Sequence, residues 1–193
     1  MKSIKTRLLL LTIPLITTLV LSACASAPSH LIISPDVTAI PEIKYDSKQA
    51  TLNVTDMRTA NHLVQILKES DAASLFSAQE RLEKIIKRSI SVPWQTQGLT
   101  IQASAVNSIN IAIEKAITSV TQETMSYQAQ SEIILKVTIN NGLQTLTSTF
   151  KNSGDSKGPF RADIAVLERN FNQRLTNLLQ QILVNEEINQ FLR

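Results

Sequence analysis

The stretch Met125-Ser-Tyr-Gln-Ala-Gln-Ser-Glu-Ile-Ile-Leu-Lys-Val-Thr-Ile-Asn140 decides the fold. Every second residue from Met125 to Ile139 is apolar or small, and the residues between them are mostly Ser, Gln, Glu, Lys and Thr. This period of two predicts a long strand with one buried face and one polar face. Asn140-Asn141-Gly142 follows, and Asn and Gly tolerate the positive φ that a hairpin turn requires. We therefore expect an antiparallel partner strand over residues 143–150.

Neighbouring segments extend the predicted sheet. Apolar and polar residues alternate over residues 50–55, which predicts a half-buried strand. A second strand over 62–67 is expected to pair with it through a turn at 58–61. Residues 99–113 alternate in the same way and predict one long or bulged strand. Together with the two strands around Asn140 it would form an antiparallel meander with an open polar face.

Two longer segments have the spacing of amphipathic helices. Ser77-Ala-Gln-Glu80 has the spacing of a capping box, and the apolar residues after it predict a helix over 77–91, ended by Val92-Pro93. Lys151–Pro159, KNSGDSKGP, contains two of the four glycines and predicts a loop. Pro159 would lie near the first turn of a second helix, whose apolar face runs from Phe160 to Ile182. Asn185 is expected to cap a short final helix.

These elements follow one another in the order ββαβββα. Strands and helices in this order predict a single α+β domain over residues 50–193. We expect an antiparallel sheet of about four to five strands, with two amphipathic helices packed on one face.

The N-terminus has the pattern of a lipoprotein signal peptide. A basic start precedes the apolar run Leu8–Leu21, which at about 14 residues is too short for a membrane span of roughly 20. Leu21-Ser-Ala-Cys24 resembles the bacterial lipobox and contains the only cysteine of the chain. We predict that residues 1–23 are cleaved off between Ala23 and Cys24. The Cys24 thiol would take a diacylglycerol, and the new amino terminus would be acylated, for example by a palmitoyl group.

Residues 24–49 are predicted to be the lipidated N-terminus and a proline-rich tether. Pro28, Pro35 and Pro41 make such a segment extended and stiff, so we expect it to hold the domain a few nanometres from the membrane. The apolar triplet 31–33 favours docking on the domain. Ala25, in place of Asp, resembles the pattern of lipoproteins sent to the outer membrane, facing the periplasm; the inner membrane is the alternative.

Composition and motifs exclude several function classes. The chain has 19 Lys and Arg against 16 Asp and Glu, but three of the basic residues precede Cys24, so nothing favours nucleic acid as a partner. The two histidines, His30 and His62, have no other His or Cys nearby, and a metal site is not expected. No glycine-rich phosphate loop and no nucleophile with a flanking base are present. The sequence predicts a protein that is not an enzyme and has no cofactor.

Two groups of residues are candidates for binding. Asp56 and Arg58 follow the first strand of the domain and form either a binding turn or a pair that satisfies itself and the backbone. Gln128, Gln130 and Lys136 lie on the polar face of the strand from Met125 to Ile139. Trp94 is expected to fill the core.

Four motifs carry a resemblance to a known family: the Leu-Ser-Ala-Cys box, IISPDV at 32–37, LNVTDMRT at 52–59 and INQFL at 188–192. The chain resembles the YajG-type lipoproteins, which are uncharacterised bacterial envelope proteins. Residues 107–124, rich in Asn, Ile and Thr, depart from the family pattern. The resemblance implies an outer-membrane lipoprotein, anchored through lipid and without a known activity.

Three functions are consistent with these observations. The first is a non-catalytic envelope lipoprotein that acts through protein–protein contacts. The second is an assembly factor that binds lipid or glycolipid between helix and sheet, which the apolar C-terminal helix motivates. The third and weakest is an activator of a cell-wall enzyme.

Overall fold

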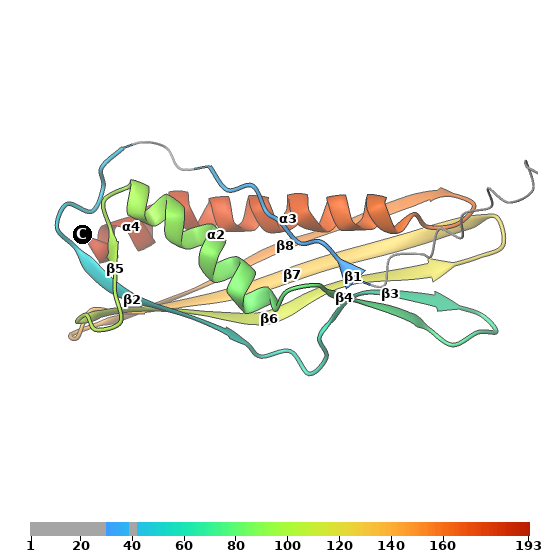
Figure 1. The fold of residues 1–193 in the computed structure, drawn as a ribbon, viewed down its shortest axis with the longest axis horizontal. Helices are drawn as coiled ribbons and strands as arrows, with labels where there is room; N and C mark the ends of the chain where they lie inside the picture. Colours follow the sequence, from blue (N-terminus) through green and yellow to red (C-terminus); the bar gives the residue numbers. More distant parts are fainter. Residues whose placement is uncertain (1–29, 39–41) are drawn as a thin grey trace, which may run out of the picture.

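The computed structural model describes residues 30–38 and 42–193. Within these residues one mixed sheet contains eight strands and is accompanied by three helices (Figure 1). The strands are β1 (His30–Leu31), β2 (Gln49–Asp56), β3 (His62–Lys68), β4 (Ser74–Ala78), β5 (Thr100–Ile101), β6 (Asn107–Gln122), β7 (Ser126–Asn140) and β8 (Thr145–Pro159). The helices are α2 (Leu82–Thr96), α3 (Ile164–Val184) and α4 (Glu186–Leu192).

Strand β6 organises the sheet. It pairs antiparallel with β7, which in turn pairs antiparallel with β8. On its other edge, β2 pairs with residues 107–113 and β3 with residues 118–122, both in parallel. β2 and β3 therefore lie end to end along β6. The prediction of a hairpin between them is wrong, as is the prediction of a purely antiparallel sheet of four to five strands.

The predicted strand over 99–113 is divided in the structure. β5 is a two-residue strand beside β2, and β6 starts only at Asn107 and continues to Gln122. The buried residues of β6 follow the odd numbers as far as Ile113 and the even numbers from Ala116 onward. A β-bulge between Ile113 and Lys115 causes this change, and it interrupts the period of two that would have identified the whole strand.

The predicted loop Lys151–Pro159 is the second half of β8, paired with β7 as far as Ser126. The two glycines of this half allow large side chains to lie directly against the strand. A Cβ at Gly154 would lie 2.4 Å from Nη1 of Arg174, and one at Gly158 would lie 2.7 Å from Cε1 of Tyr127. Glycine inside a strand often marks such an approach, so here it indicates large side chains beside the strand.

Both predicted ends of the first helix are wrong. Ser77 lies in β4, and α2 starts at Leu82 after Arg81, which makes no side-chain capping bond. The pairing of β4 with β3 and β1 has overridden the local capping pattern. The helix also passes through Pro93 to Thr96. Burial of Trp94 on the same face as the preceding apolar residues explains this, and it confirms that Trp94 belongs to the core.

The second predicted helix starts later than expected. The carboxylate of Asp163 accepts a hydrogen bond of 2.9 Å from the amide of Ala165 and caps α3, so Pro159 is not in its first turn. Phe160 lies outside the helix and is 63% exposed. Asn185 caps α4 as predicted, through a bond of 2.9 Å from the amide of Ile188.

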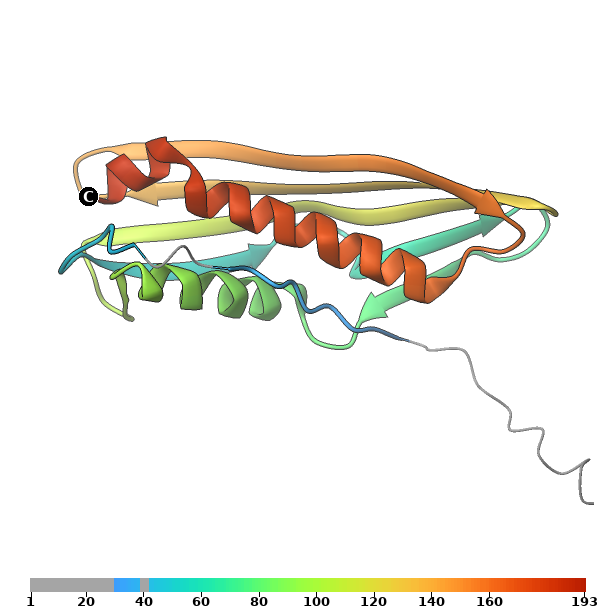
Figure 2. The same ribbon diagram turned by 90° about the horizontal axis from the view of Figure 1, so that it is seen from above.

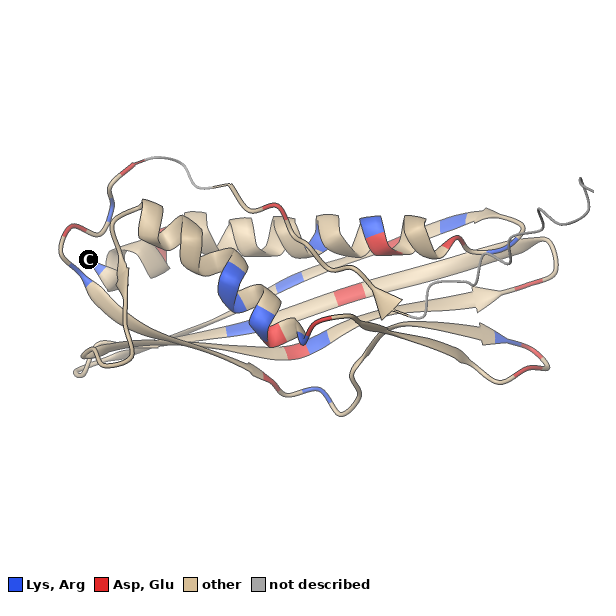
Figure 3. Cartoon of the chain, viewed as in Figure 1, with Lys and Arg blue, Asp and Glu red and all other residues tan. Residues whose placement is uncertain are grey.

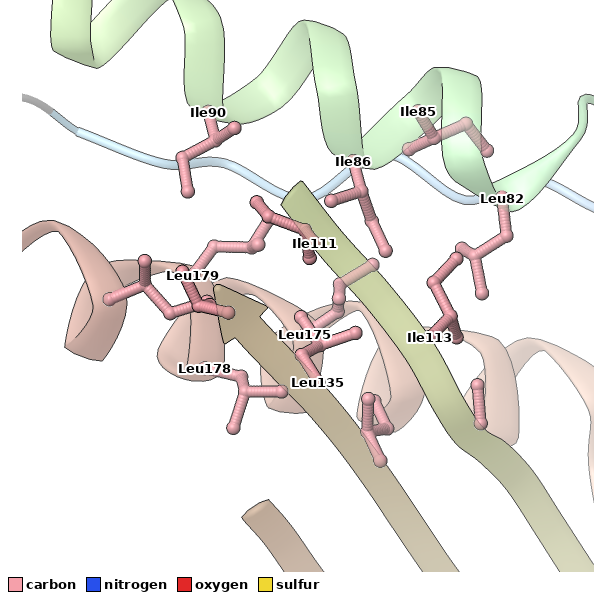
Figure 4. Packing of buried hydrophobic residues seen from close by; sticks show 14 of the residues in the cluster. Leu82, Ile85, Ile86, Ile90, Ile111, Ile113, Leu135, Leu175, Leu178 and Leu179 are labelled. Carbon is pink, nitrogen blue, oxygen red and sulfur yellow. The ribbon is translucent and has the colours of Figure 1, made fainter. Parts of the chain in front are cut away.

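The core lies between the sheet and the helices. The sheet curls, and α2 and α3 cover its concave side (Figure 2). Figure 4 shows Ile86 and Ile90 of α2 and Leu175 of α3 packed around Ile111 and Leu135 of the sheet. The predicted single α+β domain is confirmed, and its third helix, α4, is the short one that Asn185 caps. In residues 30–38 and 42–193, no helix is both long enough and apolar enough to span a membrane.

Residues 30–38, which we call the strap, run in extended form along α3. Leu31 and Ile33 are buried although Ile32 is 62% exposed, so this segment docks on the domain, and Tyr45 is fully buried as well. The folded domain therefore includes residues before Ala50. Polar side chains of α3 hold the strap at every second residue: Ile32 N donates to Glu168 Oε2 (2.7 Å), Ser34 N to Asn172 Oδ1 (2.8 Å), Asp36 N to Thr176 Oγ1 (3.1 Å), and Gln180 Nε2 donates to Thr38 O (3.1 Å).

The spacing of these bonds has a geometric cause. The strap groups are two residues apart and their partners on α3 are four residues apart. Two extended residues rise about 6.6 Å and four helical residues rise about 6.0 Å, so the two repeats stay aligned over the length of the strap.

Candidate functional site

Cys24 and Ala23 lie outside the described residues. Lipidation of Cys24 and cleavage before it therefore stay predictions. The candidate residues that the structure describes fall into two groups, the turn after β2 and the open face of β7.

Asp56 and Arg58 fill the gap between β2 and β3 on the edge of β6. Arg58 donates to the two carboxylate oxygens of Asp56 from Nε (2.9 Å) and Nη2 (2.7 Å). Its Nη1 donates to the carbonyl oxygen of Ala116 at 3.1 Å. Ala116 lies in the part of β6 that neither β2 nor β3 pairs with, so the guanidinium replaces a missing strand partner.

The electrostatics of this turn agree with a structural role. The side chains of Arg58 and Asp56 are only 8% and 15% exposed. Burial by itself would raise the pKa of Asp56, but the hydrogen bonds and charge of Arg58 outweigh it and hold that pKa below its ordinary value of 3.8. The pair also lines a cleft of about 530 Å³ with Glu80, Arg81 and Glu83. A binding role for the pair stays a prediction.

The other candidates lie on the convex face of the sheet, opposite the helices. Gln128, Gln130 and Lys136 are exposed, while their neighbours Ala129 and Leu135 point into the core. The period of two that predicted the strand therefore also places these three side chains correctly on a polar face. We call the outward-facing side of β6, β7 and β8 the open face.

Glu132 is the electrostatic centre of the open face. It forms ion pairs with Lys115 of β6 and Lys151 of β8, which join three strands. Hydrogen bonds from the two lysines, Lys115 first, lower the pKa of Glu132 to about 2, although burial opposes them. A depression of about 340 Å³ beside it is lined by Gln130 and Asp155 among others. Figure 3 shows acidic and basic residues interspersed over the molecule.

Sequence reasoning did not identify this ion-pair cluster. Glu132 follows Gln130 by two positions, so the period of two already placed it on the same face. Lys151 was assigned to a loop, and the bulge displaced Lys115 from the expected pattern. The structure also brings His30 and His62 into one row, on either side of Ser77. Among the described residues, no group of three or more His, Cys, Asp or Glu is placed to hold a metal ion.

A curled sheet with helices on one side and a strap docked along α3 defines this protein as an α+β domain. The chain belongs to the family described as "Uncharacterized lipoprotein", whose family model matches residues 35–193. The uncharacterized lipoprotein YajG of Escherichia coli (strain K12) is 20% identical over 184 residues, which cover 93% of this chain and 94% of that protein. The predicted YajG-type family is thereby confirmed.

A solved structure supports the fold. Protein XCC0632 from Xanthomonas campestris matches with a TM-score of 0.57 and 12% identity, over 83% of this chain and 96% of that one. At this identity the likeness shows the fold alone. Membership of a lipoprotein family implies that the chain is associated with the cell envelope through lipid.

Proposed function

We propose that the chain is a non-catalytic lipoprotein, anchored in the outer membrane through Cys24, that acts in the periplasm through protein–protein contacts on the open face. The observation that carries this proposal is the open face itself. The helices cover the opposite side of the sheet and leave the polar side of its three longest strands, of 15 to 16 residues, to the solvent.

The composition of the open face suits a reversible contact. Thr, Ser, Gln and Lys side chains alternate outward along β7 and β8. Interfaces that form and dissociate are about as polar as the rest of a protein surface. The outer edge of β8 is a less suitable contact, because Lys151 and Lys157 lie along it and lysines on an edge strand oppose pairing with another strand.

The state of Glu132 supports a non-catalytic role. A general acid or base works best with a pKa near the operating pH. The two lysines shift the pKa of Glu132 in the other direction, to about 2, so this carboxylate holds no proton to donate near neutral pH. Its geometry is that of a cross-strand clamp.

Packing argues against a lipid between helix and sheet. Leu135 of β7 and Leu175 and Leu178 of α3 are fully buried and belong to one continuous core. A lipid in that position would require α3 to leave the sheet and expose this core.

Site-specific photocrosslinking in living cells tests the proposal. A photoreactive amino acid at Gln128, Gln130 or Lys136 is expected to give the same discrete adduct, whereas one at the exposed Lys87 of α2 is not. The absence of any adduct from the open face, or identical adducts from α2, would refute a contact on the open face.

A further inference from the structure

One end of the domain combines the exit of the N-terminus with exposed apolar side chains. We call it the turn end; it consists of the β3–β4 connection (69–73), the β6–β7 turn (123–125) and the β8–α3 connection (160–163). These connections lie together because β3 runs parallel to β6 toward Gln122, and Ser126 of β7 pairs with Pro159 of β8. Figure 1 shows them at the same extremity of the molecule.

The docked strap leaves little chain between the domain and Cys24. Five residues separate Cys24 from His30, and the six Cα–Cα steps between them span at most about 20 Å. His30 pairs with Ser77, one residue further from the turn end than the row that contains Phe76 and Thr118. Four residues lead from Thr118 to the end of β6, so this end lies about 17 Å beyond His30.

The two lengths nearly agree, and this limits where a lipid on Cys24 can enter a bilayer. Even a fully extended connection carries Cys24 only a few ångströms beyond the last residue of β6. The opposite end of the domain, at the β7–β8 turn, lies about 30 Å on the other side of His30. A bilayer that holds the lipid on Cys24 must therefore contact the turn end or the side of the domain next to it.

The turn end carries exposed apolar side chains in a fixed arrangement. Met125 is 65% exposed and Phe160 63% exposed, and the amide of Phe160 donates to the carbonyl oxygen of Met125 at 2.8 Å. The side chain of Gln122 holds the connection in place, because its Nε2 donates to Phe160 O (2.8 Å) and its Oε1 accepts from Ala162 N (2.9 Å). Leu75, at 55%, is exposed on the neighbouring β4.

The backbone of Phe160 adds a second indication. Its φ is +60°, a conformation that a bulky side chain adopts only at an energetic cost. An exposed ring recovers little of that cost by packing inside the domain. Strained backbone conformations of this kind cluster at functional sites.

We infer that the turn end, through Met125 and Phe160, lies in the surface of the lipid bilayer that holds the anchor. This inference rests on the proposed lipidation of Cys24. The charges at this end are mixed: Lys68 and Arg161 line one depression with Glu69, Asp71 and Glu123, and Lys157 lines the next one with Glu123. Contact with the bilayer therefore depends on apolar burial, and salt has little effect on it.

Depth measurements on the lipidated full-length protein in vesicles of phosphatidylethanolamine and phosphatidylglycerol test this inference. The only natural cysteine, Cys24, carries the lipid, so a cysteine introduced elsewhere can be labelled selectively. A polarity-sensitive fluorophore on Met125→Cys is expected to shift to shorter wavelengths and to be quenched by brominated lipids. The matched control is Leu143→Cys at the opposite end, where Leu143 is 94% exposed; its label should behave as in water.

Equal spectra at both positions would overturn the inference. Mass spectrometry of the mature N-terminus and flotation with vesicles test the proposed anchoring separately from the contact of the turn end with the bilayer. An unlipidated chain that does not float refutes the proposed anchoring and the inference with it. A lipidated chain that floats, with a label at position 125 that reports water, refutes the inference alone.

A second variant tests the apolar contribution without endangering the fold. Phe160→Gly relieves the positive φ, so its thermal midpoint should equal or exceed that of the parent protein. Quenching at position 125 should fall at least about twofold in this variant, because the ring no longer enters the apolar region. Leu143→Gly, made as the control, should leave the quenching unchanged. Quenching that is unchanged in Phe160→Gly, or that disappears in high salt, would contradict apolar docking.

Discussion

Replacing Arg58 by Leu is expected to destabilise the domain by about 3 kcal/mol. The substitution leaves the Asp56 carboxylate, only 15% exposed, without its bidentate partner. It also removes the donor from the carbonyl oxygen of Ala116 in the gap between β2 and β3. A buried charge that has lost its partner is among the most costly defects in a fold.

The magnitude follows from these contacts. A hydrogen bond to a charged group contributes about 1.5–3 kcal/mol, and Arg58 makes two of them to Asp56. Protonation of Asp56 limits the loss, because burial raises its pKa once Arg58 is absent. For a domain of this size, about 3 kcal/mol corresponds to a fall in thermal midpoint of roughly 6–12 °C.

Urea unfolding of the purified mature protein, followed by circular dichroism, measures this change. Arg58→Lys is the matched control: it keeps the charge but loses the planar fork, and it should fall between the parent protein and Arg58→Leu. Asp56→Asn combined with Arg58→Leu should be more stable than the sum of the single changes, because no charge is left stranded. A loss of stability below about 0.5 kcal/mol in Arg58→Leu, or strict additivity of the two substitutions, would refute the structural role of the pair and favour a binding role for this turn.

Three further predictions concern other parts of the fold. The pKa of Glu132 is lowered from 4.5 to about 2, so its ion pairs stabilise the domain above pH 4.5 and this contribution is lost as the pH falls from 4.5 toward 2. In Glu132→Gln the free energy of unfolding should therefore depend less on pH in that window. The difference from the parent protein should be less than about 1 kcal/mol, because the ion pairs are partly exposed. Asn172→Ala removes the acceptor of the Ser34 amide and the donor to the carbonyl oxygen of Ile32. Hydrogen exchange should therefore accelerate at the Ser34 amide and stability should fall by about 1–2 kcal/mol, whereas Gln173→Ala on the exposed side of α3 should change neither. Burial raises the pKa of Tyr45 to about 12, so in an absorbance titration Tyr45 should stay protonated at about pH 11 and ionise only at higher pH. The variant Tyr45→Phe should lack this ionisation step.

Local patterns predicted β7 and its turn because both depend on short-range physics. The burial of alternate residues from Ala129 to Ile139 needs only one covered face, and the Asn and Gly residues form the turn with their own side chains and backbone. β6 shows the limit of this reasoning. A single bulge at Ile113 reverses which residues point inward, so a search for alternation sees two short fragments in place of one long strand.

Elements that depend on distant partners could not be predicted from their own residues. The segment around Gly154 and Gly158 has the composition of a loop. Only the positions of Arg174 and Tyr127, which lie against the two glycines, show why the strand needs glycine there. Ser77 begins a sequence with the spacing of a capping box, but pairing with β3 places it in a strand. Among the binding candidates, alternation along β7 was sufficient to place Gln128 and Gln130 on the open face. Glu132 lacked a predicted partner because the half of β8 that carries Lys151 was predicted to be a loop.

The strap changes how the N-terminus connects domain and membrane. A stiff tether over residues 24–49 would hold the domain a few nanometres away, but the strap binds α3 along the stripe Glu168, Asn172, Thr176 and Gln180 and removes most of that length. With six residues, 24–29, left before His30, the proposed lipid on Cys24 would bring the turn end to the bilayer and direct the long strands away from it. In this proposed arrangement the open face would extend into the periplasm beside the membrane, where a partner could bind it without displacing either the strap or the helices.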